Sequence, residues 1–264
     1  MESEEPRVVE PYTALAAGYD VVMEHVDYEL WADYVTDLLL EHAPDTRSIL
    51  ELGCGTGTLA LALQERAEEV TGTPAGFEYL ATDASAEMIR VARAKARLAG
   101  RAAGNVTFEV ADFASTEAPR PVDAVLLLYD GLNYLLKEEE VARMLARVAA
   151  VLRPGGVAIL DQSTPANSIN NEAFFSDEGQ AEDFSYVRRS SYDRETNLHV
   201  TEFDLAVEGE RFVEHHVQRA YELDEIRTLI EASPLAVEAV YDGFSLDPAG
   251  DDAERLHWVL RQPG

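Results

Sequence analysis

The stretch from residue 48 to residue 163 alternates between short apolar segments and helical segments, and this alternation constrains the fold more than any other feature. The segments between the apolar runs, at 55–67, 85–100 and 138–153, have helical spacing of apolar residues. Strands that alternate with helices predict a parallel sheet with helices on both faces, and ligands of such sheets bind outside the carboxyl ends of the strands. The predicted strands are SILELGC (48–54), FEYLATD (77–83), VTFEVAD (106–112), DAVLLLYD (123–130) and VAILDQS (157–163).

The segments on either side of this pattern have a different character. Helical spacing over residues 11–42 predicts an N-terminal helical cover within 1–47. Residues 184–221 contain three β-rich runs with no helix between them, which predicts an antiparallel insert at 166–220. A helix at 222–233 and strands at 235–242 and 254–262 return the chain to the main sheet, so 48–165 and 221–264 are expected to form one α/β domain.

The charge balance limits the partners of this chain. It contains 50 acidic and 21 basic residues, which gives a formal net charge of −29. Such a surface repels phosphate backbones and anionic lipids, so neither nucleic acid nor a membrane is expected as a partner. The acidic residues are spread over both halves of the chain, which fits either plain solubility or adaptation to high salt.

Cysteine content and hydropathy indicate the compartment. Cys54 is the only cysteine, so an intrachain disulfide cannot form. The N-terminus is acidic where a signal peptide would be basic, and no apolar run reaches the length of a membrane span. We therefore expect a cytoplasmic protein.

Polar clusters follow three of the predicted strands. Gly53, Gly55 and Gly57 form a G-x-G-x-G turn between the first strand and its helix, where the backbone can approach a ligand closely. Asp83 ends the second strand, where a carboxylate can accept bonds from both ribose hydroxyls. Asp112 and Phe113 end the third and suit an adenine amine and its ring. The alternatives are a tight turn, an acid before a helix, and a loop aspartate beside a core phenylalanine. Taken together, the clusters predict a nucleoside site without phosphates.

These motifs resemble the class I S-adenosylmethionine-dependent methyltransferases, over about residues 40–262. The resemblance rests on ELGCGTG (51–57), ATDASAEMI (81–89), the Asp112–Phe113 pair, YDGLNY (129–134) and LRPGG (152–156). It implies a Rossmann-like fold that binds S-adenosylmethionine and releases S-adenosylhomocysteine, with the N-terminal helix covering the cofactor. The cofactor-binding residues that it implies are Tyr12, Tyr19, Glu51, Gly53, Cys54, Gly55, Gly57, Asp83, Ala84, Met88, Asp112, Phe113 and Tyr129.

The acceptor is expected beside residues 129–134 and under the insert. Asp130 and Tyr134 follow the fourth strand, close to where the resemblance places the methyl group, although the segment can also be a capped turn. In EHHVQRAY (214–221), His216 is a candidate base or substrate-binding group, and the alternative is a structural cross-strand network. We find no His/Cys cluster at ligand spacing, so no metal is expected.

The function expected from the sequence is methyl transfer to nitrogen or oxygen of a small molecule by in-line displacement, by a monomer or a homodimer. The insert favours a small acceptor because it would roof the pocket, and together with residues 129–134 it is similar to amino-sugar N-methyltransferases. One alternative is an RNA or protein methyltransferase. Another is a regulatory protein that binds S-adenosylmethionine or a nucleoside without turnover.

Overall fold

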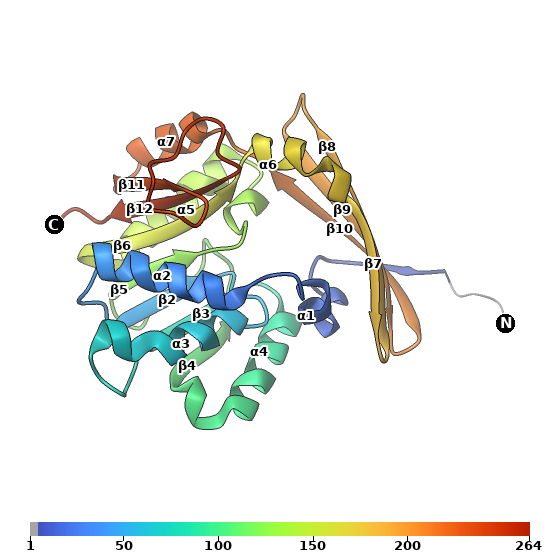
Figure 1. Ribbon diagram of the computed structural model, residues 1–264, viewed down its shortest axis with the longest axis horizontal. Coiled ribbons are helices and arrows are strands. Elements are labelled where there is room, and N and C mark those ends of the chain that lie inside the picture. The colour runs from blue at the N-terminus through green and yellow to red at the C-terminus, as the bar shows by residue number, and fades with distance from the viewer. Residues whose placement is uncertain (1–4) are drawn as a thin grey trace.

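The computed structural model describes residues 5–264, which form two β-sheets, with most of the helices packed on the larger one (Figure 1). The larger sheet has seven strands in the order β11-β12-β6-β5-β2-β3-β4. These strands are β2 (Ser48–Leu52), β3 (Glu78–Asp83), β4 (Asn105–Val110), β5 (Val122–Leu127), β6 (Leu152–Ser163), β11 (Ala236–Asp242) and β12 (Arg255–Arg261).

The strands from β2 to β6 run parallel, and β12 and β11 complete the sheet in antiparallel pairing. The carboxyl ends of the parallel strands therefore meet at one edge, which confirms the predicted α/β architecture. Within the described part of the chain, none of the helices combines the length and apolar character that a bilayer crossing needs.

Helices cover both faces of the larger sheet (Figure 1). Alternate residues of β2 face opposite sides: Ile49 packs into one core with the first helical layer, and Leu50 into another core with the second layer. The first layer contains α2 (Tyr28–His42), α3 (Thr58–Thr71) and α4 (Ala86–Ala99), and the second contains α5 (Glu138–Val151) and α7 (Leu223–Glu231). Helix α3 continues through part of the 68–76 stretch that has a loop-like sequence, and ends at Gly72.

The smaller sheet is the antiparallel insert, joined by one strand from the N-terminus. Its order is β1-β10-β9-β8-β7, and β1 pairs parallel with β10. The sequence predicted three runs, whereas the structure has a further strand before them, the polar segment SDEGQA, which lacks apolar alternation. The strands are β1 (Arg7–Val9), β7 (Ser176–Ala181), β8 (Phe184–Asp193), β9 (Leu198–Val207) and β10 (Glu210–Arg219).

The N-terminal cover differs from the expected continuous helical region at 11–42. Only its second part forms a long helix, α2, while η1 (Leu15–Ala17) and α1 (Tyr19–Val22) are short and pack against the insert. Leu15 and Val22 bury against the insert sheet, and a Cβ atom at Gly18 between them would stand 2.2 Å from the ring of Phe184. Helix α2 begins only after Asp27, whose side chain accepts a bond from the amide of Leu30, so the cover is divided between the two sheets at residues 23–27.

The remaining helices are short. The 3-10 turn η3 (Leu132–Tyr134) follows β5, and the 3-10 turn η2 (Gly100–Ala103) follows α4. Helix α6 (Pro165–Asn170) and the 3-10 turn η4 (Glu172–Phe174) lead from β6 into the insert. The short helices of the cover lie between the larger sheet with its helices and the insert (Figure 1).

Candidate active site

The glycine turn after β2 has the backbone conformation that its sequence predicts. Gly53, Gly55 and Gly57 have φ angles of 68°, 55° and 74°. A Cβ atom at Gly57 would lie 2.6 Å from the ring of Phe108, so this glycine permits close packing beneath the turn. At Gly53 a Cβ atom would lie 3.2 Å from the ring of Phe113. The turn thus needs glycine both for its positive φ angles and for the close approach of its neighbours.

Asp83 is held at the end of β3 by backbone donors. The amide of Gly55 donates to its Oδ2 over 2.9 Å, and the amide of Ser85 donates to its Oδ1 over 2.8 Å. Burial raises the pKa of Asp83, and these two hydrogen bonds offset only part of that effect. Its carboxylate borders the main cavity of the protein with acceptor positions still free, since each oxygen can accept two bonds.

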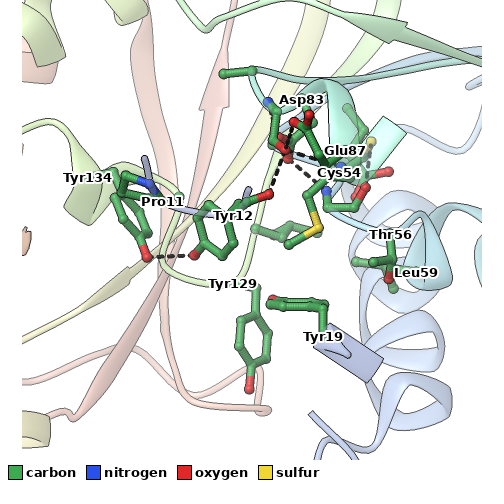
Figure 2. Close-up of a pocket in the computed structure, with 18 of the residues that line it drawn as sticks. Pro11, Tyr12, Tyr19, Cys54, Thr56, Leu59, Asp83, Glu87, Tyr129 and Tyr134 are labelled. Carbon is green, nitrogen blue, oxygen red and sulfur yellow. Dashed lines mark hydrogen bonds between the residues drawn. The ribbon is translucent and has the colours of Figure 1, made fainter. Parts of the chain in front are cut away.

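The main cavity has a volume of about 610 Å³ and lies between the glycine turn, β3, residues 129–135 and the cover. This volume lies within the range of ordinary small-molecule sites. Figure 2 shows Asp83 and Cys54 on one side of it and Tyr12 and Tyr134 on another. Of the predicted cofactor residues, those that line the cavity are Tyr12, Tyr19, Glu51, Gly53, Cys54, Gly55, Asp83, Ala84, Met88, Asp112, Phe113 and Tyr129.

Gly57, the remaining predicted residue, does not line the cavity. It lies beneath the turn and packs against Phe108. Two aromatic side chains of α2, Tyr28 and Trp31, also line the cavity, and the sequence did not single them out. Their helical spacing is that of ordinary core packing, so the sequence contains no signal that separates them from their neighbours.

Asp112 uses much of its hydrogen-bonding capacity locally. Its Oδ1 accepts from the amides of Ala114 and Ser115, and its Oδ2 accepts from the hydroxyl of Ser115. Its partial burial raises the pKa, but these hydrogen bonds outweigh that effect and leave the pKa of Asp112 below its ordinary value. The remaining acceptor position is on Oδ2, so Asp112 has less to offer a ligand than Asp83.

Glu51 is a buried acid at the floor of the cavity. The hydroxyl of Tyr79 donates to its Oε2 over 3.0 Å. Burial raises the pKa of Glu51 to about 7, and the hydrogen bond from Tyr79 acts in the opposite direction. The acid can therefore change its charge near neutral pH.

The cover is tied to this cavity at two places. Ser85 donates its hydroxyl to the carbonyl of Tyr12 over 2.8 Å. On the far side, Lys95 forms a 2.6 Å ion pair with Asp20, which also accepts a 2.7 Å bond from Thr56 in the glycine turn. These contacts hold residues 12–20 across the mouth of the cavity.

A second cavity of about 320 Å³ lies between residues 130–133, α6 with η4, and the inner face of the insert sheet. Phe174 and Phe175 supply apolar surface on one side. Most of the remaining lining is uncharged and polar, with serine, threonine, asparagine, glutamine and histidine side chains. These are Asn133, Ser163, Asn167, Ser168, Asn171, Ser190, His199, Thr201 and Gln218.

Residues 129–134 separate the two cavities. Tyr129, Gly131 and Tyr134 border the main cavity, while Asp130 and Asn133 border the second one. Tyr129 and Asp130 both have a φ of 61°, which is unfavourable for residues other than glycine. Backbone strain of this kind, of order 1–3 kcal/mol per residue, tends to occur at functional sites.

An ion-pair network fixes Asp130. Arg255 of β12 lies 2.9 Å from its Oδ1 and also pairs with the fully buried Asp161 at the end of β6. The amide of Asp130 donates to Asp161 over 2.9 Å. Burial raises the pKa of Asp161, while the charge of Arg255 opposes this effect. The Asp130 carboxylate is therefore neutralised by Arg255, which suits a residue that positions the segment.

His216 lies behind the wall of the main cavity. It is buried on β10, and its Nδ1 is 2.9 Å from the hydroxyl of Tyr134. Its Nε2 lies 3.0 Å from the carboxylate of Glu214. The structure thus connects His216 and Tyr134 directly, and it places Asp130 in a separate network.

The fold and the main cavity define a Rossmann-like protein with a nucleoside-sized site over a glycine turn. Comparison with known proteins finds methyltransferases among the similar sequences and structures. The family described as "Methyltransferase domain" matches residues 49–156. A protein of Geobacillus sp. (strain WCH70) with a methyltransferase name is 28% identical over 261 residues, covering 95% of this chain and 99% of its own length.

Two further matches extend this result. A crystal structure of an S-adenosylmethionine-dependent methyltransferase from Clostridium acetobutylicum has a TM-score of 0.76 at 22% identity, over 96% of this chain and 99% of its own. An amino-sugar N,N-dimethyltransferase of Streptomyces venezuelae is 29% identical over 135 residues, which is 51% of this chain and 50% of its own. Residues 49–156 therefore match a methyltransferase domain, and the chain has the fold of a solved S-adenosylmethionine-dependent methyltransferase.

The residues present fit S-adenosylmethionine. The half-buried Asp83 carboxylate can accept bonds from a diol, and the glycine turn gives space that any Cβ atom would fill. When bound, the cofactor supplies a methyl group on a positively charged sulfur, which leaves as a neutral thioether. The protein must hold the acceptor in line and exclude water.

Proposed function

We propose that this enzyme methylates a nitrogen or oxygen atom of a small polar acceptor that binds in the second cavity, with S-adenosylmethionine in the main cavity. The observation that carries this proposal is the position of residues 129–134. One side of this segment borders the cofactor cavity and the other borders the polar cavity under the insert. An acceptor under the insert would reach the methyl group past Tyr129 and Tyr134.

The lining of the second cavity favours a hydroxyl- or amine-rich acceptor. Amide and hydroxyl side chains line most of it, with the rings of Phe174 and Phe175 on one side. The charged residues in its lining, Asp130 and Arg188, are each paired with an opposite charge, Arg255 and Asp177. Amide, hydroxyl and aromatic groups bind polar, uncharged ligands by hydrogen bonds and by contact with C–H faces. The relative from Streptomyces venezuelae acts, by its name, on an amino sugar, which is an acceptor of this type.

Two observations count against larger acceptors. The net charge of −29 disfavours RNA. The second cavity, at about 320 Å³, is roofed by the insert sheet and suits a molecule of sugar or amino-acid size. A protein acceptor would have to insert a side chain or terminus into this space.

In this proposal the predicted catalytic residues have separate roles. Tyr134 contacts the acceptor from the wall of the main cavity, and His216 acts behind it through their 2.9 Å contact. Asp130 positions the segment through Arg255. We propose that the cofactor contacts residues that line the main cavity, namely the glycine turn, Asp83 and the Asp112–Phe113 pair.

The proposal is tested by filling the second cavity without touching the first. Ser190 points into it from β8, and Ser190→Phe should abolish formation of S-adenosylhomocysteine with a panel of amino sugars and amino acids while binding of S-adenosylmethionine is unchanged. Ser191→Phe is the matched control, because Ser191 is the exposed neighbour on the same strand. Unchanged turnover in Ser190→Phe would contradict the proposed acceptor site.

A further inference from the structure

A chain of hydrogen bonds leads from the main cavity into the insert. The hydroxyls of Tyr12 and Tyr134 are 2.5 Å apart and point toward one another (Figure 2). The hydroxyl of Tyr134 is also 2.9 Å from His216 Nδ1, and His216 Nε2 is 3.0 Å from Glu214. The chain begins at a residue that lines the cofactor cavity and ends at a fully buried carboxylate.

The carboxylate of Glu214 has four hydrogen-bond partners, two at each oxygen. Its Oε1 accepts from the amides of Ala14 and Leu15, over 2.6 and 2.9 Å. Its Oε2 accepts from the amide of Tyr12 over 2.7 Å and contacts His216 Nε2. Because an ionised carboxylate has four lone-pair positions and no proton, these four partners fill it, and each of them must donate.

This saturation sets the direction of the whole chain. A neutral His216 that donates to Glu214 carries its proton on Nε2, and Nδ1 of that tautomer is an acceptor. Tyr134 then donates to Nδ1, and Tyr12 donates to Tyr134. The oxygen of Tyr12 is left with free lone pairs at the cavity.

We propose that this chain is a proton relay that removes the acceptor's proton during methyl transfer, with Glu214 as the positioning residue that orients it. The inference rests on the proposed function. As the acceptor's lone pair forms the new bond to the methyl carbon, the electron pair of the breaking carbon–sulfur bond remains on sulfur. The acceptor's reacting atom reaches past Tyr134 into the main cavity, where its proton moves to Tyr12. The proton of Tyr12 moves to Tyr134, and that of Tyr134 to His216 Nδ1.

The proton then rests on His216 as an imidazolium beside the Glu214 carboxylate, and it returns to solvent by the same path when product leaves. The titratable groups that face His216 are Glu214 on its own strand, Tyr12 from the cover and Tyr134 from η3. From the neighbouring strand β9 its partners are Thr201 and Phe203, which do not titrate.

Glu214 also links the relay to closure of the cofactor site. The three amides that it holds belong to residues 12–15 of the cover, and this segment carries Tyr12 across the cavity. The same carboxylate therefore orients His216 and seats the first residue of the relay. The relay is complete only while the cover is closed.

The test uses nuclear magnetic resonance on the full chain, labelled with ¹⁵N and ¹³C and saturated with S-adenosylhomocysteine, so it needs no acceptor. Long-range ¹H–¹⁵N spectra should show His216 at neutral pH as the Nε2–H tautomer, in a signal that disappears in His216→Gln. In Glu214→Gln the tautomers should mix. His215→Gln, which changes the exposed neighbour on the opposite face of β10, should leave the signal unchanged.

A titration tests whether the chain is connected. In the wild type, the Cζ signal of Tyr12 should shift with the same midpoint as His216, and Tyr134→Phe should remove that shift while the protein stays folded. An Nδ1–H tautomer or a charged ring at neutral pH in the wild type would overturn the relay, as would a Tyr12 titration that Tyr134→Phe does not change. These outcomes leave methyl transfer itself unaffected, so they are distinct from failure of the proposed function.

Discussion

At the residue scale, two aspartates at neighbouring strand ends have different surroundings. Asp83 is half-buried and accepts two backbone bonds, whereas Asp112 accepts three bonds within its own turn. Spacing at strand ends predicted both positions, because the ends of parallel strands meet at one edge. The sequence could not show which of the two aspartates has more hydrogen-bonding capacity left for a ligand, because the local partners of Asp112 depend on how its turn folds.

This difference predicts unequal effects on cofactor binding. Asp83→Ala removes two hydrogen bonds to a charged group, worth about 1.5–3 kcal/mol each, so affinity for S-adenosylmethionine should fall roughly 100- to 10,000-fold. Asp112→Asn should change it less than about 10-fold, because Asp112 is occupied locally. Calorimetry measures the affinity of both variants for S-adenosylmethionine. Equal losses of affinity would contradict the assignment of Asp83 as the main polar contact.

The buried acid Glu51 predicts a pH dependence of stability. Its pKa in the folded state is about 7, above the ordinary value of 4.5 for a glutamate. An acid whose pKa is raised by folding stabilises the fold below its unfolded pKa, and this contribution is lost as pH rises through the folded pKa. Its full loss is on the order of 3 kcal/mol, from 1.36 kcal/mol per unit.

Glu51→Gln should therefore narrow the difference in unfolding free energy between pH 5 and pH 8, because a glutamine stays neutral and still accepts from Tyr79. Urea unfolding of both proteins at the two pH values gives that difference. The prediction fails if the unfolding free energy of the wild type and that of Glu51→Gln fall by the same amount between pH 5 and pH 8.

At the element scale, the parallel core was predictable and the cover was not. Apolar alternation located β2 to β6 and the helices between them, since burial on both faces leaves a strong signal. Strand β7 is a polar edge strand, so its sequence carries no such signal. The cover is divided at residues 23–27 because Leu15 and Val22 pack against the insert, which includes Phe184, a residue far along the chain.

The glycine turn provides a prediction at this scale. Gly57 and Gly72 both have positive φ at the ends of α3, but a Cβ atom would clash with Phe108 at Gly57 and meet nothing within 4 Å at Gly72. Gly72→Ala should cost about 1 kcal/mol from backbone strain alone. Gly57→Ala should cost roughly 2 kcal/mol more and weaken cofactor binding. Thermal unfolding measures the stability of both variants. Equal losses of stability would show that close packing beneath the turn is unimportant.

At the scale of the whole molecule, the charge predicts a dependence on salt. The 50 acidic residues exceed the basic ones by 29 and are spread over the chain. Repulsion among them is screened over about 10 Å at 0.1 M salt and about 3 Å at 1 M. We expect the melting temperature to rise from dilute buffer to molar KCl. Equal stability in both buffers would remove the hypothesis of adaptation to high salt.

The two cavities that meet at residues 129–134 make the central claim testable in one measurement. The protein is incubated with S-adenosylmethionine carrying a trideuterated methyl group and with a cell extract separated into small-molecule, RNA and protein fractions. Mass spectrometry then locates the label. We predict label only in the small-molecule fraction, and its loss with Ser190→Phe. Label in RNA or protein, or none in any fraction while the cofactor binds, would contradict the account.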